Sequence, residues 1–155
     1  AAYPVFHGGL EPMGHYAKSN RPANTVMVIN VGASAGTVGF STTEFWSSDG
    51  CYAIEHCDLL NSKFLYYALI GFQHHLRSRV RVAGIPTLDA IVVEKIKIPV
   101  PSPAEQARIV AILDKFDTLT NSISEGLPKE IELREKQYAY YRDLLFNFPK
   151  PEGVA

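Results

Sequence analysis

The chain has 155 residues, 46% of them hydrophobic and 11% aromatic, and a formal net charge of −1. This length supports one domain with a hydrophobic core but not two large ones, and the charge excludes a strongly basic, histone-like binder. Two cysteines do not form a secreted disulfide framework, no N-terminal stretch resembles a signal peptide, and no apolar run approaches the roughly 18 residues of a membrane span. We therefore expect a cytoplasmic protein without a membrane partner.

The N-terminal part alternates short apolar runs with turn residues, which predicts β-strands. Residues 3–6, YPVF, are expected to form an edge strand because proline cannot donate to a central ladder. Residues 7–24 are rich in glycine, proline and asparagine and predict a loop. The uninterrupted apolar run at 25–31 is typical of a buried strand. Two further strands are expected at 37–40 and 51–55.

Helical spacing begins after the third predicted strand, where apolar residues recur three and four positions apart. Asn61 or Ser62 is suited to cap a helix that continues to about residue 78. Thr87 is suited to cap a second, short helix. The alternation at 96–100 is typical of a strand that closes the globular part.

The C-terminal third predicts two long amphipathic helices. Ser102 is suited to cap the first, Pro103 fits its first turn, and Glu105 complements its dipole. The second is expected from about residue 128 to residue 146. Because the apolar stripes have the spacing of a coiled-coil seam, the first helix should fold back on its neighbour or pack against a partner helix. The predicted helix–helix interface comprises Ile109, Ile112, Leu113, Phe116, Leu119, Ile123, Ile131, Tyr138, Tyr141 and Leu145.

Three local patterns resemble chemical sites, but their spacing or context departs from such sites. The glycine-rich segment 28–39 lacks the spacing of nucleotide-binding loops, so its glycines are expected to permit a sharp turn and a close approach to another surface. Ser34 lies in a G-x-S-x-G run that strand residues follow, and a hydrolase centred on it stays open as a rival interpretation. No cofactor is expected from the glycine segment. No metal is expected either, because no common zinc spacing is formed by Cys51, His56, Cys57, His74 and His75.

The densest positive segment contains Arg77, Arg79 and Arg81, directly after two histidines. On a helix end such cations interact favourably with the C-terminal dipole, which requires no ligand. Guanidinium groups also pair bidentately with phosphate oxygens. The residues alone therefore leave both a solvated helix end and a phosphate contact open.

Longer segments carry a resemblance to a known family. IPVPSPAEQARIVAILDKFDTLTNSI and GLPKEIELREKQYAYYRDLLF closely resemble the conserved helical region of the DNA-specificity subunits of type I restriction–modification systems. YPVFHGG, VINVGASAGTVGF, EFWSSDGCYAIE and GIPTLDAIVVEKIKIPVP resemble a target recognition domain of that family. The resemblance implies a non-catalytic, cofactor-free chain that binds double-stranded DNA, recruits methyltransferase subunits and meets the restriction subunit through the complex.

The resemblance also implies how the chain is organised. The fold class is mixed α/β (α+β), with a small twisted-sheet target recognition domain at 1–101 and long coiled-coil-forming helices at 102–148. The first domain is expected to lack the family's usual opening of roughly two dozen residues, and 149–155 should be a disordered tail. Because members usually carry two recognition domains, we expect a half-subunit that pairs with a second copy or a second recognition half.

Loops are the expected DNA-facing elements, because recognition domains read bases from loops on a rigid sheet. These are the long loop 7–23 and the glycine loop 32–37. A helical scaffold without direct DNA readout is the alternative function. The predicted DNA-binding residues are Lys18, Arg21, Ser34, Thr37, His74, Arg77, Arg79 and Arg81.

Overall fold

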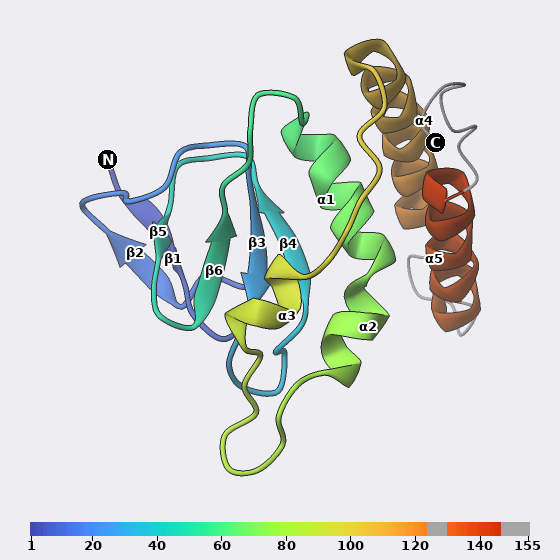
Figure 1. Cartoon of the computed structure of the whole chain (residues 1–155). Coiled ribbons are helices and arrows are strands. Elements are labelled where there is room, and N and C mark those ends of the chain that lie inside the picture. The colour runs from blue at the N-terminus through green and yellow to red at the C-terminus, as the bar shows by residue number, and fades with distance from the viewer. Residues whose placement is uncertain (124–129, 147–155) are drawn as a thin grey trace.

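The computed structural model describes residues 1–123 and 130–146, with the side chains of residues 1–122 and 134–145. Two small sheets lie at one side, helices α1 and α2 stand beside them, and helices α4 and α5 form the far side (Figure 1). The elements are β1 Tyr3–Phe6, β2 Gly14–Tyr16, β3 Thr25–Ile29, β4 Val38–Ser41, β5 Trp46–Ser47, β6 Cys51–Ile54, α1 Ser62–Gly71, α2 Gln73–Ser78, α3 Ala90–Glu94, α4 Pro103–Ile123 and α5 Glu130–Phe146.

The first sheet has the strand order β2-β1-β5, so β1 is its central strand and the predicted edge position is wrong. Pro4 is tolerated there because the parallel pairing with β5 begins only at Val5, and no ladder hydrogen bond to β5 is required from Pro4. The predicted loop 7–24 contains β2, and β5 was not predicted either. These strands of three and two residues are too short for an alternating pattern.

The second sheet has the order β4-β3-β6 with antiparallel pairs throughout. Every residue of β3 is buried, which confirms the predicted buried strand, and β4 and β6 confirm the two strands predicted after it. The predicted strand at 96–100 is wrong, because this segment is irregular. Pro99 lacks a backbone donor, which disfavours a ladder across this segment.

Helix α1 is capped as predicted: the Asn61 side chain accepts hydrogen bonds from the backbone amides of Lys63 and Phe64. The helix expected to reach residue 78 is divided, because Phe72 leaves the helical conformation (φ −99°, ψ 1°) and α2 begins after it. Gly71 weakens the helix just before this break.

The short helix α3 follows Asp89 rather than the predicted cap at Thr87, which is engaged in β-bridges instead. The long helix α4 begins at Pro103 as predicted, and the Ser102 hydroxyl accepts from the Glu105 amide at 3.3 Å. The expected start of the second long helix at about residue 128 and the expected tail at 149–155 lie outside the described residues.

The larger of the two core clusters among the described residues joins the second sheet to the two long helices. Helix α1 packs on β3 and β4 through one face and on α4 and α5 through another. Residues from the last two helices, including Ile109 and Tyr141, are therefore buried in the same cluster as Val28 of the sheet. A smaller cluster lies beneath the first sheet and contains Phe6, Met27, Ile29, Phe45 and Cys51.

Candidate nucleic-acid interface

The glycine loop after β3 packs tightly against helix α2. Gly36 has φ +88°, and a Cβ atom built on it would lie 2.8 Å from the backbone nitrogen of Arg77. Only glycine fits this conformation and this spacing without displacing backbone. The predicted role of the glycines, to allow a close approach to another surface, is confirmed at Gly36.

Side chains strengthen the contact between the glycine loop and α2. The Arg77 guanidinium donates to the Thr37 hydroxyl at 2.8 Å, and the Gln73 side-chain oxygen accepts from the Val38 amide at 2.9 Å. Ser34 lies half-buried in the same loop, where its carbonyl accepts from the Thr37 amide. The structure thus brings Arg77 of α2 to the glycine loop that contains Ser34 and Thr37, although Arg77 and Thr37 are 40 positions apart in the sequence.

The segment after α2 forms a projecting loop, the lowest part of the molecule as drawn in Figure 1. Its base is closed by two backbone hydrogen bonds between Arg81 and Thr87, at 2.8 and 3.0 Å. The Arg81 guanidinium forms a bidentate ion pair with Asp89, at 2.8 and 3.0 Å, and this hydrogen bonding lowers the pKa of Asp89. Arg81 therefore braces the loop, whereas Arg79 is exposed and forms no ion pair within the described residues.

His74 lies on a groove of about 520 Å³ between helices α1 and α2 on one side and α5 on the other. Two of its lining residues are joined by a hydrogen bond, in which the Gln73 amide donates to the Tyr138 hydroxyl at 3.2 Å. Three basic residues line the groove with a single carboxylate, that of Glu135. The lining basic residues are His74, Arg77 and Arg142. The basic surface of α2 thus continues onto α5.

Lys18 and Arg21 do not join this cluster. Both precede β3 in the chain, whereas the glycine loop follows it. Lys18 is exposed, and Arg21 forms an ion pair at 3.2 Å with Glu55, which directly follows β6, the antiparallel partner of β3. Arg21 therefore lies near the start of β3, away from the group around α2.

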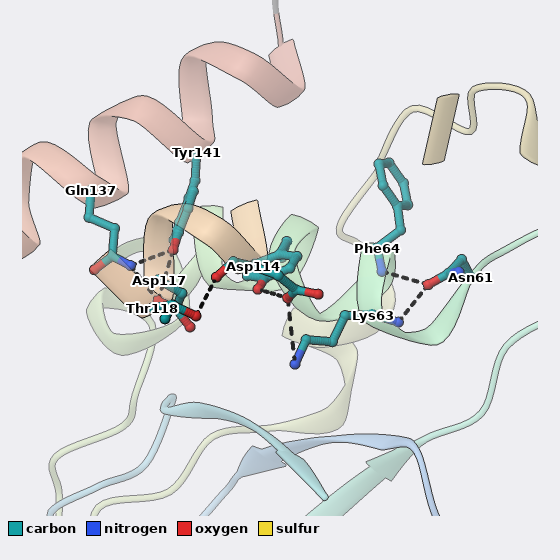
Figure 2. Close-up of polar contacts among 9 residues, drawn as sticks. Asn61, Lys63, Phe64, Asp114, Asp117, Thr118, Gln137 and Tyr141 are labelled. Carbon is teal, nitrogen blue, oxygen red and sulfur yellow. Dashed lines mark hydrogen bonds and ion pairs between the residues drawn. The ribbon is translucent and has the colours of Figure 1, made fainter. Parts of the chain in front are cut away.

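Polar contacts that the sequence did not predict connect the helices to one another (Figure 2). Tyr67 of α1 donates to Asp114 of α4, and Lys63 lies 3.9 Å from the same carboxylate. Tyr141 of α5 donates to Asp117 of α4 at 3.0 Å, and the Gln137 amide also donates to Asp117. These polar contacts hold α4 against α1 and α5 against α4.

Ionisation of the tyrosines at this junction is suppressed. Burial, with smaller effects of Asp117 and other neighbours, raises the pKa of Tyr66 to about 12. Burial also raises the pKa of Tyr67, and its hydrogen bond to Asp114 adds to the shift. Both hydroxyls therefore remain protonated, and that of Tyr67 can donate to the Asp114 carboxylate.

Gln106 holds the start of α4 to the start of α1. Its side chain is 1% exposed, accepts from the Asn61 amide at 2.7 Å and donates to the carbonyls of Leu59 and Pro101 at 2.8 and 2.9 Å. All of these partners are backbone groups that would otherwise lose a hydrogen bond. The apolar spacing of this helix predicts no role for Gln106, because its hydrogen-bond partners lie in the segments before α1 and α4.

The predicted helix–helix residues divide into buried and exposed members. Ile109, Leu113, Tyr141 and Leu145 are at most 2% exposed, and the core cluster that contains them includes α1 as well as the long helices. Phe116 stacks on Tyr140 with ring centroids 5.0 Å apart, while Ile112 is half-buried. Leu119 and Tyr138 are 60% and 39% exposed. The side chains of Ile123 and Ile131 lie outside the described residues.

The described part of the chain shows neither a metal site nor a membrane-spanning helix. Residues 1–123 and 130–146 contain no group of three histidine, cysteine or carboxylate side chains placed to hold a metal ion. None of the helices in this part is long and apolar enough to cross a membrane.

The two cysteines differ in environment. Cys51 is buried, and its burial raises the pKa of its thiol to about 11, whereas Cys57 is exposed.

The fold, the glycine loop against α2 and the paired long helices coincide with a known domain class. The family described as "Type I restriction modification DNA specificity domain" matches residues 3–133. The chain belongs to this family, which confirms the resemblance drawn from its helical segments.

Relatives of known family agree with this assignment. The chain is 57% identical over 96 residues to the type I restriction enzyme EcoR124I/EcoR124II specificity subunit of Escherichia coli, a match that covers 60% of this chain and 24% of that protein. It is 37% identical over 122 residues to a putative type I specificity subunit of Mycoplasma pneumoniae, covering 76% of this chain and 38% of that one. The chain thus spans well under half of each of these two relatives.

Solved structures confirm the mixed α/β fold. The S subunit of a type I restriction–modification system from M. genitalium aligns with a TM-score of 0.65 and 27% identity, over 86% of this chain and 36% of that one. The HsdS subunit from Thermoanaerobacter tengcongensis aligns with a TM-score of 0.61 at 23% identity, over 94% of this chain and 37% of that one, which supports the fold alone.

Proposed function

We propose that this chain reads DNA sequence as the specificity subunit, or half-subunit, of a type I restriction–modification complex. The observation that carries the proposal is the family match over residues 3–133, joined to the gathering of Thr37, His74 and Arg77 on one exposed surface. In this role the chain catalyses nothing itself. Base flipping and adenine methylation belong to the partner methyltransferase, inside the cell.

The proposed division of labour places readout in residues 1–101 and spacing in residues 102–148. Phosphate contacts from Arg77 and Arg79 orient the domain on the duplex, and the glycine loop and the projecting loop approach the bases. Lys18 and Arg21 form a second, smaller contact near the other end of β3. Ser34 acts as a loop residue that can hydrogen-bond DNA rather than as a nucleophile.

The long helices are proposed to carry the partner contacts. Leu119 of α4 and Tyr140 of α5 leave part of the ridge formed by these two helices exposed at 60% and 40%, although the same helices bury their other faces against α1. Tyr138 lies instead on the groove toward α2. This ridge would pair with a second copy or a second recognition half and would contribute to docking of the methyltransferase. The restriction subunit would join through that complex.

Salt-dependent DNA binding tests the proposal. The affinity of the purified chain for a randomised duplex library is measured between about 50 mM and about 200 mM salt, and bound duplexes are sequenced. Phosphate contacts predict an affinity that falls steeply with salt, together with enrichment of one motif. If the affinity does not change with ionic strength and no motif is enriched among the bound duplexes, the alternative of a helical scaffold would be favoured.

A further inference from the structure

The projecting loop between α2 and α3 carries two exposed aliphatic side chains at its tip. Val82 is 81% exposed and Ile85 is 71% exposed, although both are β-branched residues that usually pack in cores. Gly84 between them has φ +81° and no atoms within 4 Å of the position where a Cβ would lie, so the tip turns in open space. Neither side chain is used by the fold.

The loop is nevertheless held rigidly at its base. The backbone pairing of Arg81 with Thr87 and the ion pair of Arg81 with Asp89 close it from within. The Gly32 amide donates to the Pro86 carbonyl at 2.9 Å, which fastens the loop to the glycine loop. Because its base is held in this way, the apolar tip cannot easily fold back onto its own domain. Val82 and Ile85 therefore remain available to contact a ligand.

The charge around the tip indicates the chemistry of that ligand. Residues 74–89 contain two histidines and three arginines but a single carboxylate, that of Asp89, which Arg81 already neutralises. Exposed cations at Arg77 and Arg79 therefore directly precede the loop that carries the apolar tip. A duplex offers the complement: phosphates at the rim of the major groove and, on its floor, the C5-methyl group of thymine as the apolar feature of the base edges.

We propose that Val82 and Ile85 contact thymine methyl groups in the major groove, and so determine where the recognised sequence requires thymine. This inference rests on the proposed function and adds to it a named base feature and the residues that read it. The major groove admits elements as wide as a two-stranded β-ribbon, and the loop is a turn closed by one antiparallel bridge between Arg81 and Thr87. Arg77 and Arg79, at the end of α2 just before the loop, supply the phosphate contacts.

Replacement of thymine by uracil tests the inference, because the two bases differ only in the C5-methyl group. The bound motif is first selected from a randomised duplex library, and each of its thymines is then replaced by uracil. The wild-type chain should lose about three- to fivefold affinity at one or more positions, the effect of one buried methyl group. The Val82→Ala/Ile85→Ala variant should bind thymine and uracil duplexes equally.

A matched control is Leu59→Ala. Leu59 lies outside the projecting loop, and its aliphatic side chain is 70% exposed, as that of Ile85 is 71% exposed. This variant should discriminate thymine from uracil as the wild-type chain does. Equal binding of both duplexes by the wild type, or discrimination retained by the double variant, would overturn the inference while salt-dependent DNA binding stands. Absence of any salt-dependent DNA binding would instead overturn the proposed function and this inference with it.

Discussion

The guanidinium of Arg77 donates a hydrogen bond to the Thr37 hydroxyl across 2.8 Å, and this contact joins helix α2 to the loop after β3. The same two segments touch through Gly36, whose Cα lies too close to the Arg77 backbone for any side chain. The projecting loop is fastened to the same glycine loop through Gly32 and Pro86. Three segments that are separate in the sequence therefore form one surface.

The arginines on this surface should set the salt dependence of DNA binding. Each phosphate contact contributes about 0.9 to the slope of log affinity against log salt, so Arg77→Ala/Arg79→Ala should reduce that slope by roughly two. Anisotropy titrations at several salt concentrations measure it. Arg108→Ala, whose arginine is paired with Glu105 on α4, is the control and should leave the slope unchanged. A double variant with the wild-type slope would exclude these arginines from phosphate binding.

Two glycines with similar positive φ should respond differently to alanine. Gly84→Ala should lower the free energy of unfolding by about 1 kcal/mol, the cost of a left-handed alanine in open space. Gly36→Ala combines this cost with displacement of the Arg77 backbone and should lower it by roughly 2 kcal/mol or more. Urea unfolding of both variants measures the difference. Equal losses would mean that the glycine loop and α2 are not packed as closely as described.

Gln106 should stabilise the chain through its buried hydrogen bonds. Gln106→Leu preserves side-chain volume but leaves the Asn61 amide and two carbonyls without partners, and the free energy of unfolding should fall by about 2 kcal/mol. Chemical denaturation provides the measurement. The exposed neighbour Arg108, replaced by alanine, should change stability little. A fully stable Gln106→Leu would show that the starts of α1 and α4 are held by packing alone.

Cys51 should make stability depend on pH in the alkaline range. Burial raises the pKa of its thiol from 9.0 to about 11, so the unfolded chain releases this proton at a lower pH than the folded chain. Stability is therefore lost as pH rises above about 9, and by about pH 10 this one thiol should cost about 1 kcal/mol. Cys51→Ala should show a correspondingly smaller decline in unfolding free energy between about pH 8 and about pH 10. Identical pH profiles would contradict the prediction.

The exposed ridge of the long helices should govern self-association. Leu119→Glu places a charge on this ridge without disturbing the buried face that contains Leu113, so it should convert an assembled chain into a monomer that remains folded. Sedimentation equilibrium gives the mass of each form. Leu59→Glu, an exposed leucine outside the long helices, is the matched control. Unchanged mass in the Leu119 variant would place the contact between copies elsewhere.

Strong local patterns were sufficient to predict the elements that carry most of the core. The apolar run of β3 and the Ser102–Pro103 start of α4 were both found, because continuous burial and helix capping leave local signals. Strands β2 and β5 left no such signal, since they consist of few residues and depend on pairing with β1. The same pairing explains why Pro4, interpreted as an edge residue, lies in a central strand.

The candidate site was predictable by residue type but not by arrangement. The arginine cluster and the glycine loop were recognisable from charge and composition, yet their contact through Thr37 and Arg77 depends on tertiary packing. Arg81 has the same residue type as its neighbours, but its ion pair with Asp89 gives it a different role. The tip residue Ile85 could have been noticed as an aliphatic residue beside Gly84 in a turn, but only the structure reveals its exposure.

The most direct test of the central claim is the pattern of DNA methylation in a host that carries this chain together with its methyltransferase, compared with the methyltransferase alone. If the chain supplies sequence recognition, adenine methylation should appear at a single interrupted motif, and only when the chain is present. A motif with two equivalent halves would indicate that two copies assemble on one site. Methylated positions that are identical with and without the chain would contradict the claim.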